Sequence, residues 1–253
     1  SACLVGSEMC IRDSHGLMIA GEAALSNWDA GMDMYIYGKL GNLTMTKEGI
    51  NVLMTNLTGK VPPILQRLDY IRFNGEAAGY LHDLTLTGLF HTGAGMVKTD
   101  VMMSIDEQSM SRTYSGSVAS ADLDLGKLLN QEKKFGKVDF NVELKGFNYK
   151  NRYPESYIKG IISSFEYSQY QYENIMLDGV YKDGGFNGRL SMDDANGSVQ
   201  IDGNFNVAKT IPDFNLKASV KNLRPHDLHL SDKYENASIS LGLTACLLYT
   251  SDA

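Results

Sequence analysis

Cysteine is nearly absent from this chain, and the few cysteines that occur lie at its two ends. The 253 residues include three, Cys3, Cys10 and Cys246. The long stretch between the second and the third therefore offers neither a disulfide framework nor a thiolate metal site. A lack of cysteine is compatible with many compartments, including the periplasm, and selects none of them.

Proline and positive charge are also scarce. The five prolines, Pro62, Pro63, Pro154, Pro212 and Pro225, lie outside the stretches of alternating apolar and polar residues. Proline must lie there if those stretches are hydrogen-bonded strands. A formal net charge of −7 gives no basic surface for nucleic acid, so we expect no nucleic-acid partner.

Catalytic and cofactor motifs are missing as well. The sequence has no P-loop, nucleophile elbow, dinucleotide fingerprint or EF-hand loop. His226 and His229 have no third ligand at a recognisable spacing, and Asp193-Asp194 fits a turn better than a catalytic carboxylate pair. We therefore expect a protein that is not an enzyme and that has no cofactor or metal.

The two ends of the chain are expected not to belong to the native protein. Met9–Ser14 reads MCIRDS and Cys246–Ser251 reads CLLYTS, and suitable codons let one oligonucleotide encode both, once in each direction. That duplex resembles a transposon-based sequencing-library adapter; the alternative is ordinary termini whose codons happen to match. We exclude residues 1–14 and 246–253 from fold reasoning. Residues 15–245 are then expected to be an internal fragment of a longer protein.

The clearest structural signal is a β-hairpin between Phe186 and Val207. Apolar and polar residues alternate on both sides of Asn196-Gly197, a pair that suits a tight connection. The pattern predicts two strands with one apolar and one polar face. The same alternation is found in residues 138–144, 214–220 and 239–243.

A glycine motif accompanies these strands. The pattern apolar-any-Gly-any-apolar recurs around Gly21, Gly38, Gly59, Gly75, Gly88, Gly116, Gly160, Gly179, Gly188 and Gly203. Glycine weakens a strand, so its repetition indicates a sharp bend in the sheet or a close approach to its backbone. The alternative is that glycine is simply frequent in β-rich chains.

Two stretches favour short helices. Residues 62–71 begin with a proline pair and place Ile64, Leu65, Leu68 and Ile71 at helical spacing. Within residues 123–135 a short helix is expected to begin near Asp122 or Asp124 as its cap. Both helices are expected to plug the end of a sheet. The prediction is an all-β fold: an elongated, curled antiparallel β-sheet repeat, shaped like a trough, with one or two short helices.

The apolar side of such strands must be shielded from water. Each strand offers several apolar side chains, each contributing about 1.5–3 kcal/mol if buried, and together they exceed the apolar area that a soluble monomer exposes. The strands can pack as a sandwich, close as a barrel, or curl around a groove that an apolar ligand fills. Alternation alone does not choose among these.

Part of the chain resembles the TamB branch of the AsmA-like superfamily. The resemblance is carried by strand, glycine and turn patterns in residues 114–118, 123–129, 136–142, 177–181, 185–190 and 214–223. It is clearest over residues 114–245. Residues 15–113 form a preceding β-rich segment in which the likeness is thin.

The resemblance implies a long periplasmic protein that an N-terminal helix, missing from this fragment, anchors in the inner membrane. Its apolar trough is expected to carry phospholipid between the inner and outer membranes. It is also expected to support outer-membrane protein assembly with an Omp85-family partner, through regions outside this fragment. Phospholipid acyl chains are the expected ligand, and the family has no catalytic residues to transfer.

We predict that twelve apolar residues line the trough, and the alternative is that they form a dry core. They are Val138, Phe140, Val142, Leu144, Phe186, Leu190, Val199, Ile201, Phe205, Val207, Leu216 and Val220. The competing function is a surface-exposed β-repeat adhesin or a carbohydrate-binding β-sandwich. That alternative predicts a closed core and exposed Tyr or Trp platforms.

Overall fold

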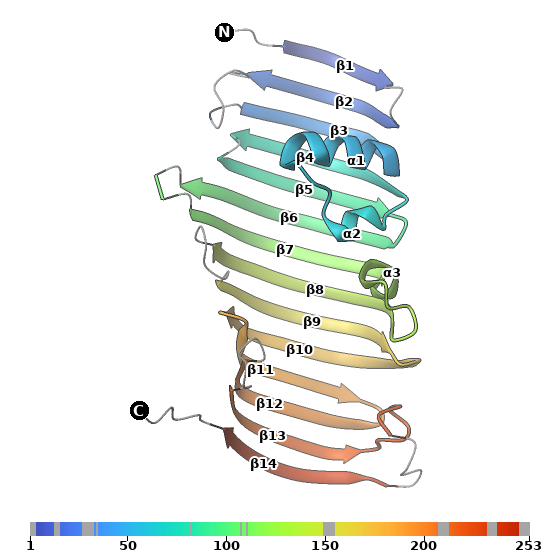
Figure 1. Cartoon of the computed structure of the whole chain (residues 1–253), viewed down its shortest axis with the longest axis vertical. Coiled ribbons are helices and arrows are strands. Elements are labelled where there is room, and N and C mark those ends of the chain that lie inside the picture. Colours follow the sequence, from blue (N-terminus) through green and yellow to red (C-terminus); the bar gives the residue numbers. More distant parts are fainter. Residues whose placement is uncertain are drawn as a thin grey trace.

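The strands of this protein form one long antiparallel sheet. The computed structural model describes residues 4–12, 16–26, 33, 35–80, 82–106, 108–109, 111–148, 155–206, 213–231 and 237–247. The fourteen strands within these residues follow one another in sequence order, from β1 at one edge to β14 at the other, and the sheet is not closed. The strands stack along the longest axis of the molecule (Figure 1). The predicted all-β, elongated antiparallel sheet is confirmed.

The strand bounds are as follows: β1 Leu4–Arg12, β2 Leu17–Ser26, β3 Tyr35–Thr46, β4 Tyr70–Tyr80, β5 Asp83–Thr92, β6 Gly95–Asp106, β7 Ser111–Asp124, β8 Phe135–Asn148, β9 Glu155–Tyr167, β10 Tyr170–Lys182, β11 Gly185–Asp194, β12 Gly197–Asn206, β13 Asp213–Leu223 and β14 Ile239–Leu247. Three helices interrupt them: α1 Lys47–Thr58, α2 Pro63–Gln66 and α3 Leu125–Leu129. Strand β1 lies in the first fourteen residues, whose adapter origin stays a prediction.

The register places the apolar residues of neighbouring strands directly opposite one another. One such row is Ile162, Ile175, Met192, Val199 and Val220, and another is Leu43, Phe73, Phe90 and Val97. Residues directly opposite in a sheet share a face. We call the face that carries Phe73, Val142 and Leu190 the apolar face, and the other the polar face.

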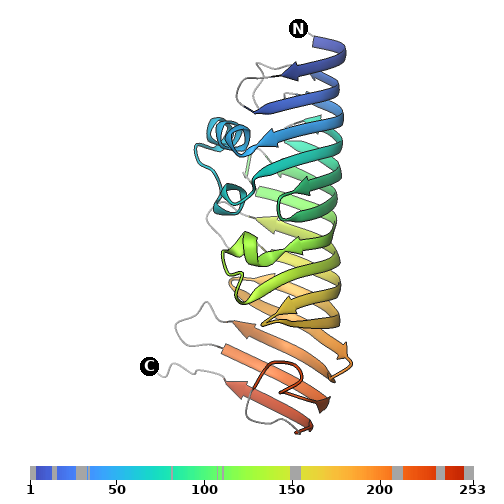
Figure 2. The ribbon, with the colours of Figure 1, turned by 90° about the vertical axis from the view of Figure 1, so that its right-hand side faces the viewer.

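The three helices cover one margin of the apolar face. They lie toward the right in Figure 1, and Figure 2 shows all of them on one side of the curled sheet. Ile50 of α1 is 1% exposed, and Leu128 of α3 is also buried. These side chains pack with Met45, Leu68, Ile71, Ala94, Leu123 and Val138 in a closed core. Part of the apolar face is therefore dry protein interior.

A turn covers the same margin farther along the sheet. We call residues 224–231, between β13 and β14, the strap. Its Leu228 is fully buried, and the Tyr172 hydroxyl of β10 donates a 2.7 Å hydrogen bond to the Leu228 carbonyl. His229 Nδ1 lies 2.9 Å from the Ser168 carbonyl in the β9–β10 turn. The strap thus reaches from β13 back to β10.

Apart from Gly59, the motif glycines occupy two adjacent rows of the apolar face. Gly179, Gly188 and Gly203 are directly opposite one another in β10, β11 and β12. At Gly116 and Gly203, φ is +144° and +143°. An added Cβ would lie 2.0 Å from the Asp100 carbonyl oxygen of β6 at Gly116, and 2.1 Å from the Asn215 carbonyl oxygen of β13 at Gly203. The close approach expected at these glycines is therefore made by the neighbouring strand.

The described part of the chain contains three helices where one or two were expected. Helix α1 was not predicted: Thr46 caps its start, and Gly59, read as a strand glycine, ends it at φ +74°. Helix α2 has four residues, and Ile71 belongs to β4 because the sheet pairing outweighs the helical spacing. Helix α3 begins after Asp124, which is one of the two residues expected to cap it. The Asp124 carboxylate accepts a 2.8 Å hydrogen bond from the Lys127 amide.

Candidate functional site

The uncovered part of the apolar face contains a cavity of about 460 Å³, which lies over β9–β13. This volume falls in the range of small-molecule sites, roughly 300–1,000 Å³. The lining residues are Ile158, Leu177, Tyr181, Gly184, Phe186, Gly188, Leu190, Ile201, Gly203, Phe205 and Leu216. None of them is charged, and the Tyr181 hydroxyl is the one polar side-chain group among them.

The strand register builds the walls of this cavity. Leu190 of β11 is directly opposite Ile201 of β12, and Phe186 is opposite Phe205 four residues away. The Phe186 and Phe205 rings are 5.9 Å apart between centroids. An aliphatic pair and an aromatic pair thus face each other across Gly188 and Gly203, which are opposite each other in register.

Five of the twelve predicted lining residues meet in this cavity: Phe186, Leu190, Ile201, Phe205 and Leu216. Phe205 is 42% exposed, so much of its ring faces solvent. Val142, Leu144, Val199 and Val220 share the apolar face, but they lie outside the cavity. Their part in binding a ligand stays a prediction.

The remaining three predicted residues lie elsewhere. Val138 is 4% exposed and belongs to the closed core with Leu123 and Leu128, so its expected place in an open trough is corrected. Phe140 is partly buried against that core. Helix α3 packs against this part of the apolar face, so a ligand cannot reach Val138 there. Val207 lies outside the described residues.

Sequence reasoning missed Ile158, Leu177 and Tyr181 as lining residues. Each lies in a copy of the glycine motif, in β9 and β10, and each faces the same side as the predicted residues. The glycine motif around Gly160 and Gly179 was therefore a signal for these lining residues. The motif identifies them only once the strand order is known, because the sequential antiparallel sheet places these two copies beside β11 and β12.

The opposite, polar face carries paired charges. Arg189 and Asp202 are directly opposite in β11 and β12, and both Nε and Nη2 of the arginine contact Asp202 Oδ2, at 3.1 and 2.8 Å. Lys182 Nζ lies 2.7 Å from Glu155 Oε2. Exposed pairs of this kind contribute at most about 1 kcal/mol each. These charged side chains keep the polar face hydrated, whereas the opposite face is apolar.

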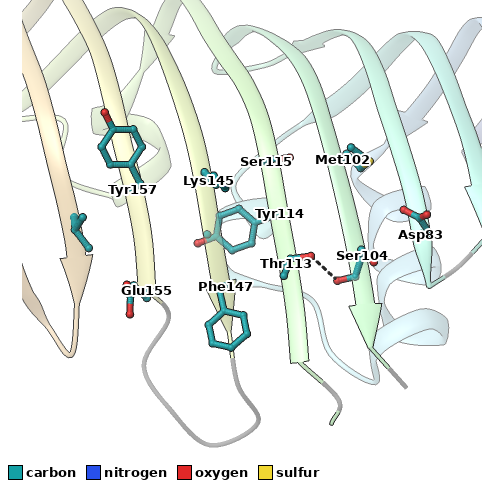
Figure 3. Close-up of a pocket in the computed structure, with 12 residues that line it drawn as sticks. Asp83, Met102, Ser104, Thr113, Tyr114, Ser115, Lys145, Phe147, Glu155 and Tyr157 are labelled. Carbon is teal, nitrogen blue, oxygen red and sulfur yellow. Dashed lines mark hydrogen bonds between the residues drawn. The ribbon is translucent and has the colours of Figure 1, made fainter. Parts of the chain in front are cut away.

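A larger hollow, of about 850 Å³, involves residues of the polar face (Figure 3). Its lining mixes Asp83, Lys145 and Glu155 with hydroxyl groups and exposed apolar side chains. The Tyr157 hydroxyl donates a 2.9 Å hydrogen bond to Asp178, and this bond raises the pKa of Tyr157. This chemistry suits no single ligand class, whereas the lining of the smaller cavity is apolar except for the Tyr181 hydroxyl.

Aromatic residues surround the strap at the covered margin. Burial, together with a hydrogen bond to Asp194, raises the pKa of Tyr170 to about 12. Burial also raises the pKa of Tyr172, whose hydroxyl is bonded to the strap. Both hydroxyls are therefore neutral donors at physiological pH, and they close this margin without adding charge.

Comparison with known proteins gives no assignment: no family model, curated protein or solved structure matches this chain. Among the described residues, no helix is long and apolar enough to cross a bilayer. His226 and His229 contact Asp227 and the Ser168 carbonyl, respectively. The candidate site is therefore an uncharged cavity, open to solvent at Phe205, on the apolar face of a single sheet.

Proposed function

We propose that the apolar face of this sheet binds the acyl chains of phospholipid, as part of a protein that carries lipid between the inner and outer membranes of a bacterial envelope. Under this proposal the chain is a segment of a TamB-like periplasmic protein, anchored in the inner membrane elsewhere in its sequence. Its contribution to outer-membrane protein assembly, with an Omp85-family partner, belongs to the same proposal.

The observation that supports it best is the uncharged cavity over β9–β13. Its walls are aliphatic and aromatic, and the apolar side chains around it remain partly exposed, Phe205 at 42% and Leu243 of β14 at 53%. Exposed apolar surface on this scale is costly in water and marks a site for an apolar partner. Acyl chains supply such a partner without any catalytic group.

The adhesin or carbohydrate-binding alternative is less well supported. A β-sandwich requires a second sheet packed on the apolar face. All strands in the described part of the chain belong to one sheet, and helices and the strap are what cover its apolar face. The alternative would have to use the polar face, where the larger hollow lies.

Lipid that co-purifies with the chain tests the proposal. We expect mass spectrometry to find phospholipid with the wild-type protein and little with the double variant Ile201→Asp, Phe205→Asp, because two carboxylates in an apolar cavity disfavour an acyl chain. Circular dichroism checks that the variant retains its strands.

The matched control is Gln200→Asp with Asn204→Asp, on the same strand but on the polar face. This variant adds the same charge and should keep its lipid. Equal lipid in all three proteins, or none in the wild type, would contradict the proposal.

A further inference from the structure

Each element that covers the margin of the apolar face also has an apolar outer side. Ile50 of α1, Leu128 of α3 and Leu228 of the strap are buried against the sheet. Outside the strands, four described residues expose a large apolar side chain, with exposed fractions of 43–54%: Val52, Ile64, Leu129 and Leu230. One lies in each of α1, α2, α3 and the strap. The covering elements therefore place apolar side chains both toward the sheet and toward solvent.

A contact between α2 and α3 joins the outer sides of these helices. The guanidinium of Arg67, which ends α2, donates a hydrogen bond to the Leu128 carbonyl of α3. Ile64 and Leu129 lie within three residues of these two partners, so their exposed side chains belong to one surface. Figure 2 shows the three helices on one side of the sheet. We call residues 47–69 and 125–134 the helical surface.

The helical surface is positively charged, in contrast to the rest of the chain. It contains six Lys or Arg and three Asp or Glu, a net charge of +3, whereas the whole chain carries −7. One of the three acidic residues, Asp69, pairs with Lys127 at 2.6 Å. Lys133 and Lys134, in the turn after α3, are exposed. A negatively charged partner is therefore attracted here and repelled by most of the molecule.

The composition of the helical surface suits a lipid bilayer better than a protein partner. Protein interfaces are enriched in aromatic residues and depleted in lysine. The helical surface has no Phe, Tyr or Trp and has five lysines. Exposed aliphatic side chains beside lysines are the combination with which amphipathic helices bind the surface of an anionic bilayer.

We infer that the helical surface docks on a bilayer that contains anionic phospholipid. Val52, Ile64 and Leu129 enter the boundary between head groups and acyl chains, and the surrounding lysines contact the phosphates. This inference goes beyond the proposed function, because the cavity over β9–β13 takes no part in the docking. A bilayer bound here lies beside the apolar face, whose margin the same helices cover.

Co-sedimentation of the full chain with vesicles is the first test. Each lysine near an anionic surface strengthens binding about five-fold. Vesicles of phosphatidylcholine with phosphatidylglycerol should therefore bind the chain at least about ten-fold more tightly than vesicles of phosphatidylcholine alone. Added salt should reduce this preference. Absence of binding to the anionic vesicles, or equal binding to the two compositions, would overturn the inference.

Ile64→Ser with Leu129→Ser tests the apolar part of the surface. Both side chains are exposed, so the double variant should fold, and it should bind the anionic vesicles at least about ten-fold more weakly. The matched control is Ile161→Ser with Met176→Ser, which removes two exposed apolar side chains from the polar face. This control should stay within about two-fold of the wild type, because the polar face does not meet the bilayer. Equal affinities of the two variants, with folding checked by circular dichroism, would contradict the docking.

A third variant separates this inference from the proposed function. Ile201→Asp with Phe205→Asp should lose its co-purified phospholipid and still bind anionic vesicles within about three-fold of the wild type, since its new charges are remote from the helices. Loss of vesicle binding in this variant would assign the docking to the apolar face and overturn the inference. If the wild-type chain co-purifies without phospholipid but binds the vesicles through Ile64 and Leu129, only the proposed function fails.

Sedimentation velocity checks the competing occupant of the helical surface, a second copy of the chain. We expect the wild-type chain to stay monomeric without vesicles. A dimer that is lost in Ile64→Ser with Leu129→Ser, together with no binding to anionic vesicles, would assign the surface to self-association and overturn the inference.

Discussion

Gly116 illustrates how single residues shape the sheet. Its φ of +144° is reached by few residues other than glycine, and the Asp100 carbonyl of β6 takes the space of a side chain. The sequence predicted a bend or a close approach at such positions, and β6 makes that approach. Gly59 has the same motif context but ends a helix, so the motif alone does not identify a strand.

Gly116→Ala should destabilise the protein by about 1–3 kcal/mol, because it adds both backbone strain and a clash with the Asp100 carbonyl. Urea unfolding measures this loss of free energy. Gly242→Ala on β14 is the control, since nothing lies within 4 Å of its added Cβ. An equal loss of free energy of unfolding in the two variants would count against the close contact between Gly116 and the Asp100 carbonyl.

Tyr170 predicts a pH dependence of stability. Its pKa of about 12 in the folded chain exceeds the value of about 10 for an unperturbed tyrosine. The stability that this shift contributes is therefore fully present below about pH 10 and is lost between about pH 10 and 12. Tyr170→Phe should cost about 1 kcal/mol at pH 8, from the lost hydrogen bonds, and less at pH 11.

Urea unfolding at both pH values measures the effect of Tyr170→Phe. Tyr80→Phe, at a tyrosine that is 43% exposed, serves as the control and should cost less than Tyr170→Phe at pH 8. A cost of Tyr170→Phe that stays constant from pH 8 to pH 11 would argue against the buried, hydrogen-bonded hydroxyl.

At the scale of elements, local signals predicted strands better than helices. The hairpin of β11 and β12 follows directly from its alternation and its Asn196-Gly197 turn. Helix α1 was missed although Thr46 and Gly59 mark its ends. The strap has no periodic signal at all, because its place depends on contacts with β10, more than fifty residues away.

The strap should depend on Leu228. Leu228→Ala removes a fully buried side chain and should cost about 2–5 kcal/mol locally, which frees residues 224–231 from β10. Hydrogen exchange should then lose protection in the strap while β11 and β12 keep theirs. Leu230→Ala, at a side chain that is 54% exposed, should change little. Unchanged exchange in Leu228→Ala would show that the strap is held by other contacts.

At the scale of the whole molecule, the sheet has a polar face and an apolar face, and only part of the apolar face is covered by protein. Alternation and strand order together predict the apolar face and much of the cavity lining. They do not predict which part of that face is covered, because α1, α3 and the strap reach it through long-range packing. Val138 and Phe186 have the same sequence pattern, yet one lies in the closed core and the other lines the cavity.

The most direct test asks whether acyl chains contact the apolar face. In a Trp28→Phe background, which removes the one native tryptophan, a single tryptophan is placed at Phe205 on the apolar face or at Asn204 on the polar face. Phospholipid with brominated acyl chains is then added. We predict strong quenching for Phe205→Trp and little for Asn204→Trp. Equal quenching at the two positions, or none at either, would contradict acyl-chain binding by the apolar face.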